Sequence, residues 1–225
     1  MSRARLTSQD WTLAALRALA AGGVAAVRVD VIARDLGVTR GSFYWHFADR
    51  DALLKAALEL WEEQLTTQVV DELDGVGDPV ERLERLTRAV FSDERVRGLQ
   101  PAIMAHADHP VVRPVLRRVT ARRVDYLTAI YAELGLEPPA ARRRAVIAYA
   151  MYLGWLDLRR GPGDVVPEVG PGPDGAAAVD AVVTMLLGGV ADHRALPGII
   201  GAWMTSGTRC RPRGPRGGWC RSCPR

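Results

Sequence analysis

The amino-acid sequence predicts an all-α fold. Along its 225 residues, apolar side chains recur at the three- and four-residue spacing of helices, and the alternation of apolar and polar residues that is typical of strands is absent. Glycine and proline fall mostly between these periodic stretches, where helix boundaries are expected. A hydrophobic content of 48% and a charged content of 25% are ordinary for a globular chain.

The first helix is expected to begin near Thr7, because a threonine hydroxyl is a common N-cap. Leu6 before this cap and Trp11 after it have the spacing of a hydrophobic staple. Gly22 and Gly23 predict the end of the helix, since glycine commonly terminates helices.

Two short helices are expected next, over residues 30–36 and 39–47. The turn between them begins at Gly37, which suits a backbone with positive φ. In the second short helix Phe43 and Phe47 are four residues apart and share one face, which we expect to be core. The rest of that helix then carries Arg40, Gly41, Tyr44 and Trp45 on the opposite face, with Ser42 and His46 at the flanks.

Longer helices are predicted for most of the remaining chain. Asp49 is the expected N-cap of a helix that reaches about residue 73. Pro101 and Pro110 are expected at helix boundaries. The later helices are predicted over residues 80–92, 99–107, 111–134, 139–160 and 176–193. Between and after them, the sequence predicts a Pro/Gly loop over 161–175 and a disordered tail over 205–225.

Charge is distributed unevenly along the chain. Residues 1–60 carry a net charge of +2, residues 61–204 carry −4, and residues 205–225 carry +6. A basic N-terminal part permits a nucleic-acid site there. The sequence has no secretory signal and no apolar run that would cross a membrane, and its three cysteines all lie in the tail, so a cytoplasmic protein without a disulfide framework is expected.

Two short helices joined by a tight turn form the helix-turn-helix unit that reads DNA. On the second of these helices, Arg40 can form a bidentate pair with guanine, and Gly41 lets the backbone approach the groove. Tyr44 and His46 can donate to phosphates, while Trp45 offers a flat apolar face to a thymine methyl. An ordinary amphipathic core helix is the alternative, but exposing Arg, Tyr and Trp together favours a binding partner.

The stretch VDVIARDLGVTRGSFYWHFADRDALLKAAL, residues 29–58, resembles the N-terminal domain of the TetR family of bacterial transcription regulators. The matching pattern is an Ile-Ala pair, a Gly-Val turn, a Thr-x-Gly start and an aromatic-Tyr-x-His-Phe end. The resemblance implies a homodimer, expected to be a repressor, that binds a palindromic operator and is released by a small-molecule effector. It also implies a three-helix DNA-binding domain over residues 1–55 and a helical effector-binding and dimerisation domain over 56–204, and it suggests that the protein is associated with the nucleoid.

Nine residues of this chain are expected to contact DNA, and the resemblance places all of them there except Arg28 and Ser42. The nine are Arg28, Thr39, Arg40, Gly41, Ser42, Tyr44, Trp45, His46 and Lys55. Thr39 is also expected to cap the recognition helix, and Lys55 to contact phosphate, with a solvated surface lysine as the alternative. Where the family usually has Thr or Ser before the first helix of the unit, this chain has Val27 and Arg28, so we expect Arg28 to replace the hydroxyl contact with a charged one.

The family has its effector pocket within the C-terminal helices and pairs its last two helices in the dimer. The resemblance therefore implies six pocket candidates, and core packing is the alternative for each of them. They are Met104, His106, Tyr126, Met151, Tyr152 and Trp155. No catalytic grouping, cofactor or metal is expected, so the protein is not expected to be an enzyme.

Two rival hypotheses remain at this point. His106, Asp108 and His109 are possible metal ligands, which allows a metal-dependent sensor or enzyme, although histidines at a helix end also commonly bind the last carbonyls. The arginine-rich tail allows a non-specific, architectural DNA-binding protein.

Overall fold

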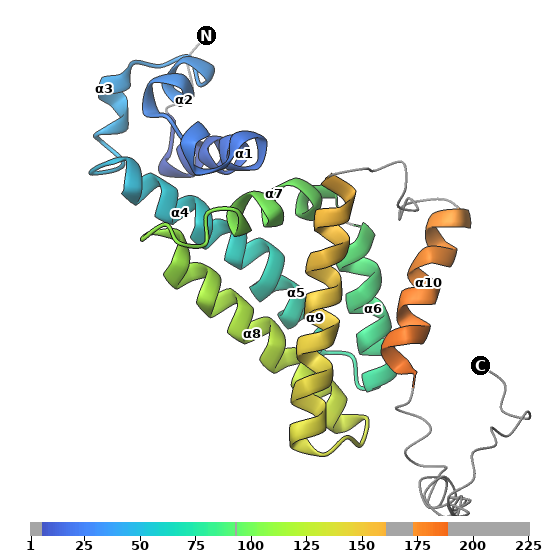
Figure 1. The fold of residues 1–225 in the computed structure, drawn as a ribbon. Helices are drawn as coiled ribbons and strands as arrows, with labels where there is room; N and C mark the ends of the chain where they lie inside the picture. The colour runs from blue at the N-terminus through green and yellow to red at the C-terminus, as the bar shows by residue number, and fades with distance from the viewer. Residues whose placement is uncertain (1–5, 93, 161–172, 189–225) are drawn as a thin grey trace, which may run out of the picture. The chain divides into compact units, whose positions relative to one another are not determined.

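The computed structural model describes residues 6–92, 94–160 and 173–188. Within these ranges the chain forms helices and no strand, which confirms the all-α prediction (Figure 1). In chain order the elements are α1 (Ser8–Ala26), α2 (Val29–Asp35), α3 (Arg40–Phe43), α4 (Arg50–Glu62), the π-helical turn η1 (Glu63–Thr67), α5 (Gln68–Asp74), α6 (Pro79–Ser92), α7 (Glu94–Met104), α8 (Val112–Glu133), α9 (Pro138–Arg160) and α10 (Pro173–Leu187).

α1 begins as predicted. Thr7 is its N-cap, because the hydroxyl accepts a hydrogen bond from the Asp10 N–H while the Asp10 carboxylate accepts from the Thr7 N–H at 2.7 Å. These hydrogen bonds hold the pKa of Asp10 below its ordinary value. The expected end at Gly22 and Gly23 is confirmed in that both residues have non-helical backbone angles; beyond this bend a short helical stretch continues α1 to Ala26. Gly23 has a φ of +68° at this bend, which glycine adopts readily.

α2 and α3 form the predicted pair of short helices. Gly37, in the turn between them, has the expected positive φ of +68°. The second helix is shorter than predicted and ends at Phe43. Beyond that point the N–H groups of Trp45 and His46 donate to carbonyls three residues back, so the chain tightens into a turn.

α4, η1 and α5 follow one another without a loop. Asp49 is the N-cap of α4, as predicted, and accepts from the Ala52 N–H at 2.7 Å. The single helix expected to run to residue 73 instead contains the π-helical turn at Glu63–Thr67. Such turns insert an extra residue into a helix and are frequent near functional sites.

The remaining helices pack around this long segment (Figure 1). α8 packs against α9, α6 against α10, and α7 against both α1 and α9. Buried apolar residues form one continuous cluster that extends from Trp11 in α1 to Leu186 in α10. The N-terminal helices are thus joined to the body through packing, and the domain boundary after residue 55 stays a prediction.

Some predicted boundaries are wrong. α7 spans Glu94–Met104 rather than 99–107, so Pro101 lies inside it; Pro101 is buried, and packing against neighbouring helices offsets the hydrogen bond that its ring removes. α10 begins at Pro173, so residues 173–175 are not part of a loop. The rest of the predicted loop, the end of the last predicted helix beyond residue 188 and the tail over 205–225 lie outside the described residues.

Candidate nucleic-acid interface and ligand cavity

Phe43 anchors α3 in the core. Its side chain is buried, with the ring of Trp11 edge-on at a centroid distance of 5.4 Å and the ring of Phe47 stacked at 5.7 Å. Trp45 is 87% exposed and Tyr44 is 57% exposed, although the Tyr44 ring also contacts Phe43 at 5.2 Å. The aromatic run is therefore divided between core and surface as helical spacing predicted.

The residues at the start of α3 are also on the surface. Thr39, Arg40 and Gly41 are exposed, and Ser42 is half-buried. Thr39 is the N-cap residue of α3 as predicted, but its side chain makes no capping hydrogen bond; the Ser42 hydroxyl donates to the Thr39 carbonyl at 2.8 Å. An added Cβ at Gly41 would meet only Thr39 Oγ1, at 3.8 Å, so packing within the chain does not require glycine there.

Two candidate phosphate contacts already have acidic partners. The Arg28 guanidinium donates to the Asp30 carboxylate at 2.9 Å, and Lys55 lies 3.7 Å from Glu59 one helical turn along α4. All four side chains are exposed, and exposed ion pairs of this kind are weak, so either cation can exchange its partner for a phosphate at small cost. His46, the remaining candidate on this surface, is half-buried.

Arg50 holds α4 at the corner between α1 and α2, a role that no local sequence pattern indicated. Its Nε donates to the Val27 carbonyl at 2.8 Å, and its Nη2 donates to the Val24 carbonyl. These carbonyls lie at the end of α1, where the Val24 carbonyl also accepts from the Val27 N–H at 3.2 Å. Arg50 therefore holds the helix-turn-helix unit on α4.

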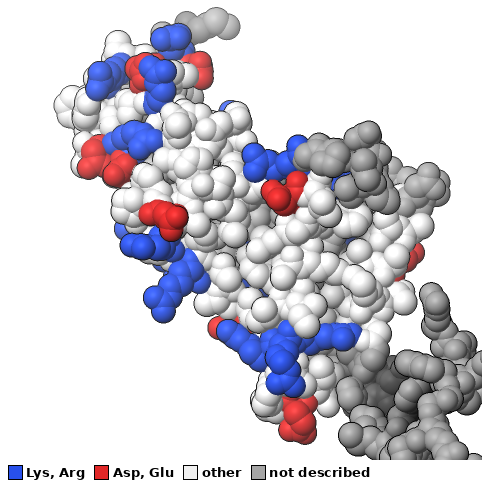
Figure 2. All heavy atoms as spheres, viewed as in Figure 1, with Lys and Arg blue, Asp and Glu red and all other residues white. Residues whose placement is uncertain are grey.

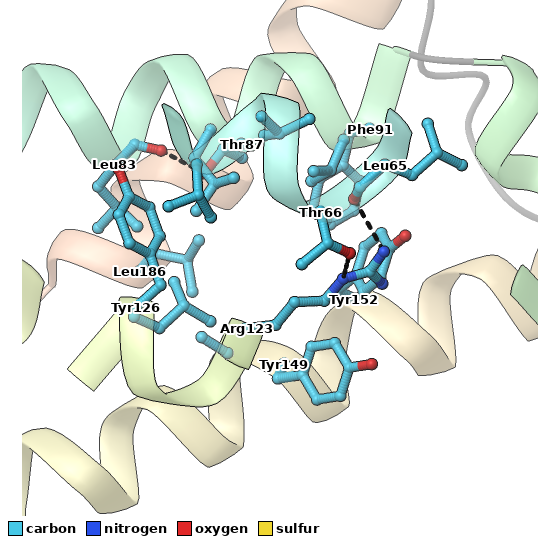
Figure 3. A pocket seen from close by; sticks show the side chains of 16 residues that line it. Leu65, Thr66, Leu83, Thr87, Phe91, Arg123, Tyr126, Tyr149, Tyr152 and Leu186 are labelled. Carbon is cyan, nitrogen blue, oxygen red and sulfur yellow. Dashed lines mark hydrogen bonds between the residues drawn. The ribbon is translucent and has the colours of Figure 1, made fainter. Parts of the chain in front are cut away.

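A cavity of about 80 Å³ lies in the helical body (Figure 3). It is lined by 16 residues from η1, α5, α6, α8, α9 and α10, of which nine are aliphatic and one is Phe91. None of the 16 is acidic. The polar lining residues are Thr66, Thr87, Arg123, Tyr126, Tyr149 and Tyr152.

Arg123 of α8 occupies one side of this cavity (Figure 3). Its guanidinium donates to Thr66 Oγ1 at 2.9 Å and to the Leu65 carbonyl at 2.8 Å, both in η1. It also donates to Gln100 Oε1 at 2.9 Å and lies 5.4 Å from the centroid of the Trp61 ring. Arg123 thus connects the cavity to the π-helical turn that continues α4.

Tyr126 faces the cavity from the side opposite Arg123 in Figure 3. Burial raises the pKa of its hydroxyl to about 12, with a further contribution from the charge of Asp74. The hydroxyls of Tyr126 and Tyr149 are buried and have no hydrogen-bond partner among the described residues. Buried hydroxyls are normally paired, so these two are available to a ligand.

Only two of the six predicted pocket residues, Tyr126 and Tyr152, line this cavity. Trp155 does not line the cavity, but its ring lies 5.7 Å from that of Phe91, which does. Met151 packs against the core and does not line the cavity either. Met104 lines a separate hollow of about 330 Å³ between α7 and α9. Arg123, Thr66, Thr87 and Tyr149 were missed; the sequence around Arg123 looks like a solvated arginine-rich face and carries no signal of its inward position.

His106 lies at the contact between α1 and α7 rather than in the cavity. An added Cβ at Gly23 would come within 2.5 Å of its ring, and its Nδ1 is 3.0 Å from the Ala102 carbonyl. His109 Nδ1 accepts from the Val111 N–H at 3.3 Å. Within the described ranges no group of three His, Cys, Asp or Glu side chains is placed to hold a metal ion, so His106, Asp108 and His109 form no such cluster.

α9 and α10 expose apolar side chains. Val146, Ile147 and Leu158 of α9 are 49%, 65% and 55% exposed, and Met185 of α10 is 58% exposed. Figure 2 shows a wide area without charged side chains in the middle of the face on which α9 lies, with charged groups towards its ends. Exposed apolar patches of this kind mark interaction surfaces. In the described part of the chain, no helix is long and apolar enough to cross a membrane.

Comparisons with known proteins agree with this arrangement. Residues 12–63 match the family model of bacterial regulatory proteins of the tetR family. The chain is 34% identical over 110 residues to the HTH-type transcriptional regulator AcrR of Shigella flexneri, a match that covers 44% of this chain and 49% of that protein. It is 38% identical over 72 residues to the uncharacterized HTH-type transcriptional regulator TtgW of Pseudomonas putida, covering 32% and 54%. The chain thus spans about half the length of the curated relatives it matches.

Solved structures resemble the whole helical fold. A transcriptional regulator from Rhodococcus is 22% identical with a TM-score of 0.68, over 81% of this chain and 96% of that one. The regulator FadR of Bacillus subtilis, solved in complex with stearoyl-CoA, is 16% identical with a TM-score of 0.64, over 81% and 99%. A regulator from Saccharomonospora viridis, solved in complex with choline, is 20% identical with a TM-score of 0.63, over 80% and 92%. At these identities the likeness concerns the fold.

Proposed function

We propose that this chain, which belongs to the TetR family of bacterial regulatory proteins, represses transcription as a homodimer that binds a near-palindromic operator and leaves it when a small molecule binds. The observation that carries the proposal is the surface of α3 and the turn after it. There Arg40, Tyr44 and Trp45 face solvent beside the buried Phe43. Large exposed aromatic side chains next to an arginine are costly to keep in water without a partner, and a DNA groove supplies one.

The nine candidate DNA residues fall into two groups. Arg40, Gly41 and Trp45 would lie against base edges, since they occupy the exposed part of α3 and its following turn. The other six, which we assign to phosphates, would set the position and orientation of the unit. They are Arg28, Thr39, Ser42, Tyr44, His46 and Lys55.

A dimer follows from the need to contact two half-sites and from the apolar surface of α9 and α10. Pairing of Ile147 and Met185 surfaces between two copies would bury side chains that one copy leaves exposed. Two recognition helices would then enter successive major grooves. We keep the expected division at residue 55 between the DNA-binding part and the body, and we place the protein on DNA in the cytoplasm without an enzymatic role.

The cavity lined by Arg123 and Tyr126 is the proposed effector site. Similar folds have been solved with stearoyl-CoA and with choline, so small-molecule binding by such a helical body has precedent. Release from DNA requires that the effector bind the free protein more tightly than the DNA-bound one.

A gel-shift titration of the purified full chain tests the proposal. The probe is a DNA fragment from around the chain's own gene, and an unrelated fragment of equal length is the control. We expect a discrete shift of the first fragment that weakens as salt rises, because phosphate contacts release counterions. Equal binding to both fragments, or no shift, would contradict the proposal.

A further inference from the structure

The charge of Arg123 lacks an acidic partner in the described part of the chain. Its three hydrogen bonds end on neutral oxygens of Leu65, Thr66 and Gln100. A guanidinium has five N–H groups, so its capacity to donate exceeds these three bonds. Several other arginines of the body, though not all, are paired with carboxylates: Arg82 with Glu133, Arg88 with Asp180, Arg118 with Glu62, Arg122 with Asp71 and Arg142 with Asp125.

The residues that line the cavity around Arg123 include a positive charge and no negative charge. No Asp or Glu is among the 16 lining residues, and ten of them are purely apolar. The half-buried guanidinium therefore brings a positive charge into an otherwise apolar space. Charge-assisted hydrogen bonds strengthen in such surroundings, while a second positive charge would be repelled without compensation.

The hydroxyl of Tyr126 supplies a further polar contact. It is buried without a partner among the described residues and lies across the cavity from Arg123 in Figure 3. A tyrosine hydroxyl is uncharged at neutral pH and can donate a hydrogen bond. A molecule that spans the cavity would thus meet an apolar wall with one cationic end and one neutral donor.

We propose that the cavity binds a small, largely apolar organic anion whose acidic group pairs with Arg123. The inference rests on the proposed function in that the same cavity is the effector site. A cationic ligand is the rival, because the rings of Phe91, Tyr149 and Tyr152 lie close together and aromatic faces attract cations. A cavity for anions and a cavity for cations predict opposite orders of affinity for an anionic and a cationic ligand with the same apolar body.

Three probes with one apolar body separate these classes: 4-phenylbutyrate, 4-phenylbutan-1-ol and trimethyl(4-phenylbutyl)ammonium. Binding of each to the purified full chain is measured by isothermal titration calorimetry at pH 7.5. We expect the carboxylate to bind at least tenfold more tightly than the alcohol and the ammonium to bind more weakly than both. Equal affinity for carboxylate and alcohol, tighter binding of the ammonium, or no binding by any probe at millimolar concentration would overturn the inference.

Variants of Arg123 test where the acidic group of the ligand binds. Arg123→Gln is expected to remove the preference for the carboxylate over the alcohol, and Arg123→Lys to retain part of it. Arg122→Gln is the matched control, because Arg122 precedes Arg123 on α8 and also binds η1, through Thr67, but does not line the cavity. Preserved preference in a folded Arg123→Gln protein would place the anion elsewhere and contradict the assignment.

The comparison in the unmodified chain decides the ligand class even if Arg123→Gln fails to fold. The gel shift described above is measured separately, so a chain that binds operator but shows no anion preference refutes only this inference. A chain that prefers the anion but does not bind operator refutes only the proposed function.

Discussion

Gly41 distinguishes a requirement of the fold from a requirement of DNA binding. Its backbone is helical with ordinary φ, and a Cβ would meet only Thr39 Oγ1 at 3.8 Å. Gly41→Ala should therefore leave stability unchanged or raise it by up to about 1 kcal/mol, because alanine favours helix. Operator affinity should fall at least tenfold, or about 1.4 kcal/mol, since the methyl group would come between backbone and groove. Thermal unfolding and a gel-shift titration measure the two effects.

Gly75→Ala is the control for this variant. Gly75 has no atom within 4 Å of an added Cβ, lies at the end of α5 and is outside the proposed interface. Operator affinity should not change in Gly75→Ala. Unchanged affinity in Gly41→Ala as well would mean that α3 does not approach DNA at this position.

Tyr126 predicts a pH dependence of stability. Its folded-state pKa of about 12 exceeds the ordinary value of 10.0, mainly because of burial. Between these two values the unfolded chain loses a proton that the folded chain keeps, so the free energy of unfolding decreases as pH rises from 10 to 12. The free energy of unfolding of Tyr126→Phe should decrease less steeply over this interval. Urea unfolding at a series of pH values measures it.

The matched control for that comparison is Tyr44→Phe, since Tyr44 is 57% exposed. This variant should keep the slope of the unmodified protein between pH 10 and 12. An identical slope in Tyr126→Phe would show that the Tyr126 hydroxyl is not buried in the folded protein.

Arg50 joins separate helices through its hydrogen bonds. It donates to the carbonyls of Val24 and Val27 and so joins α4 to the corner between α1 and α2. Arg50→Met should leave the partly buried Val27 carbonyl without this donor and the Val24 carbonyl with only the Val27 N–H, and so lower stability by about 1–3 kcal/mol. Operator affinity should also fall, because the recognition surface would no longer be held on α4. Chemical unfolding and gel shift measure both.

Arg17→Ala removes a positive charge from α1 at an exposed position and controls for net charge. It should change stability by no more than about 0.5 kcal/mol. Equal effects of Arg17→Ala and Arg50→Met would show that charge alone, rather than the two hydrogen bonds of Arg50, is responsible.

The π-helical turn η1 shows why some elements cannot be predicted from local sequence. EQLTT at residues 63–67 is compatible with an ordinary helix, and the sequence predicts one. The turn is held from a distant helix, where Arg123 donates to Leu65 and Thr66 and Arg122 donates to Thr67. Long-range bonds of this kind have no local periodic signal, so both the turn and the role of Arg123 became visible only in the fold.

Features governed by local spacing were predicted correctly. The four-residue spacing of Phe43 and Phe47 placed them against the core, and Trp45 is on the surface as that spacing requires. The caps of α1 and α4 at Thr7 and Asp49 also follow from local chemistry. The cavity was predicted less well because its lining comes from six separate elements, and residue type alone did not separate Tyr126 from Met151.

At the scale of the whole molecule, the proposed function depends on the assembly of two copies into a dimer. Ile147 is 65% exposed in the middle of α9, so Ile147→Arg should leave the folded subunit intact. We expect the dimer dissociation constant to increase at least a hundredfold, or about 2.7 kcal/mol, because a charge would replace an apolar contact. Sedimentation velocity over a range of concentrations measures this change.

The control is Ala129→Arg, which adds the same charge at an exposed position on α8. It should leave the dimer unaffected. A dimer that persists in Ile147→Arg would mean that two copies meet through another surface.

The central claim is that the exposed surface of α3 and its following turn recognises operator DNA, and Trp45→Ala tests it most directly. Because Trp45 is 87% exposed, its removal should not disturb the fold. The measurement is a titration of fluorescently labelled operator by fluorescence anisotropy, with the unmodified chain in parallel. The account predicts a loss of specific affinity of at least tenfold, with unchanged thermal stability. Full operator affinity in the folded Trp45→Ala protein would contradict it.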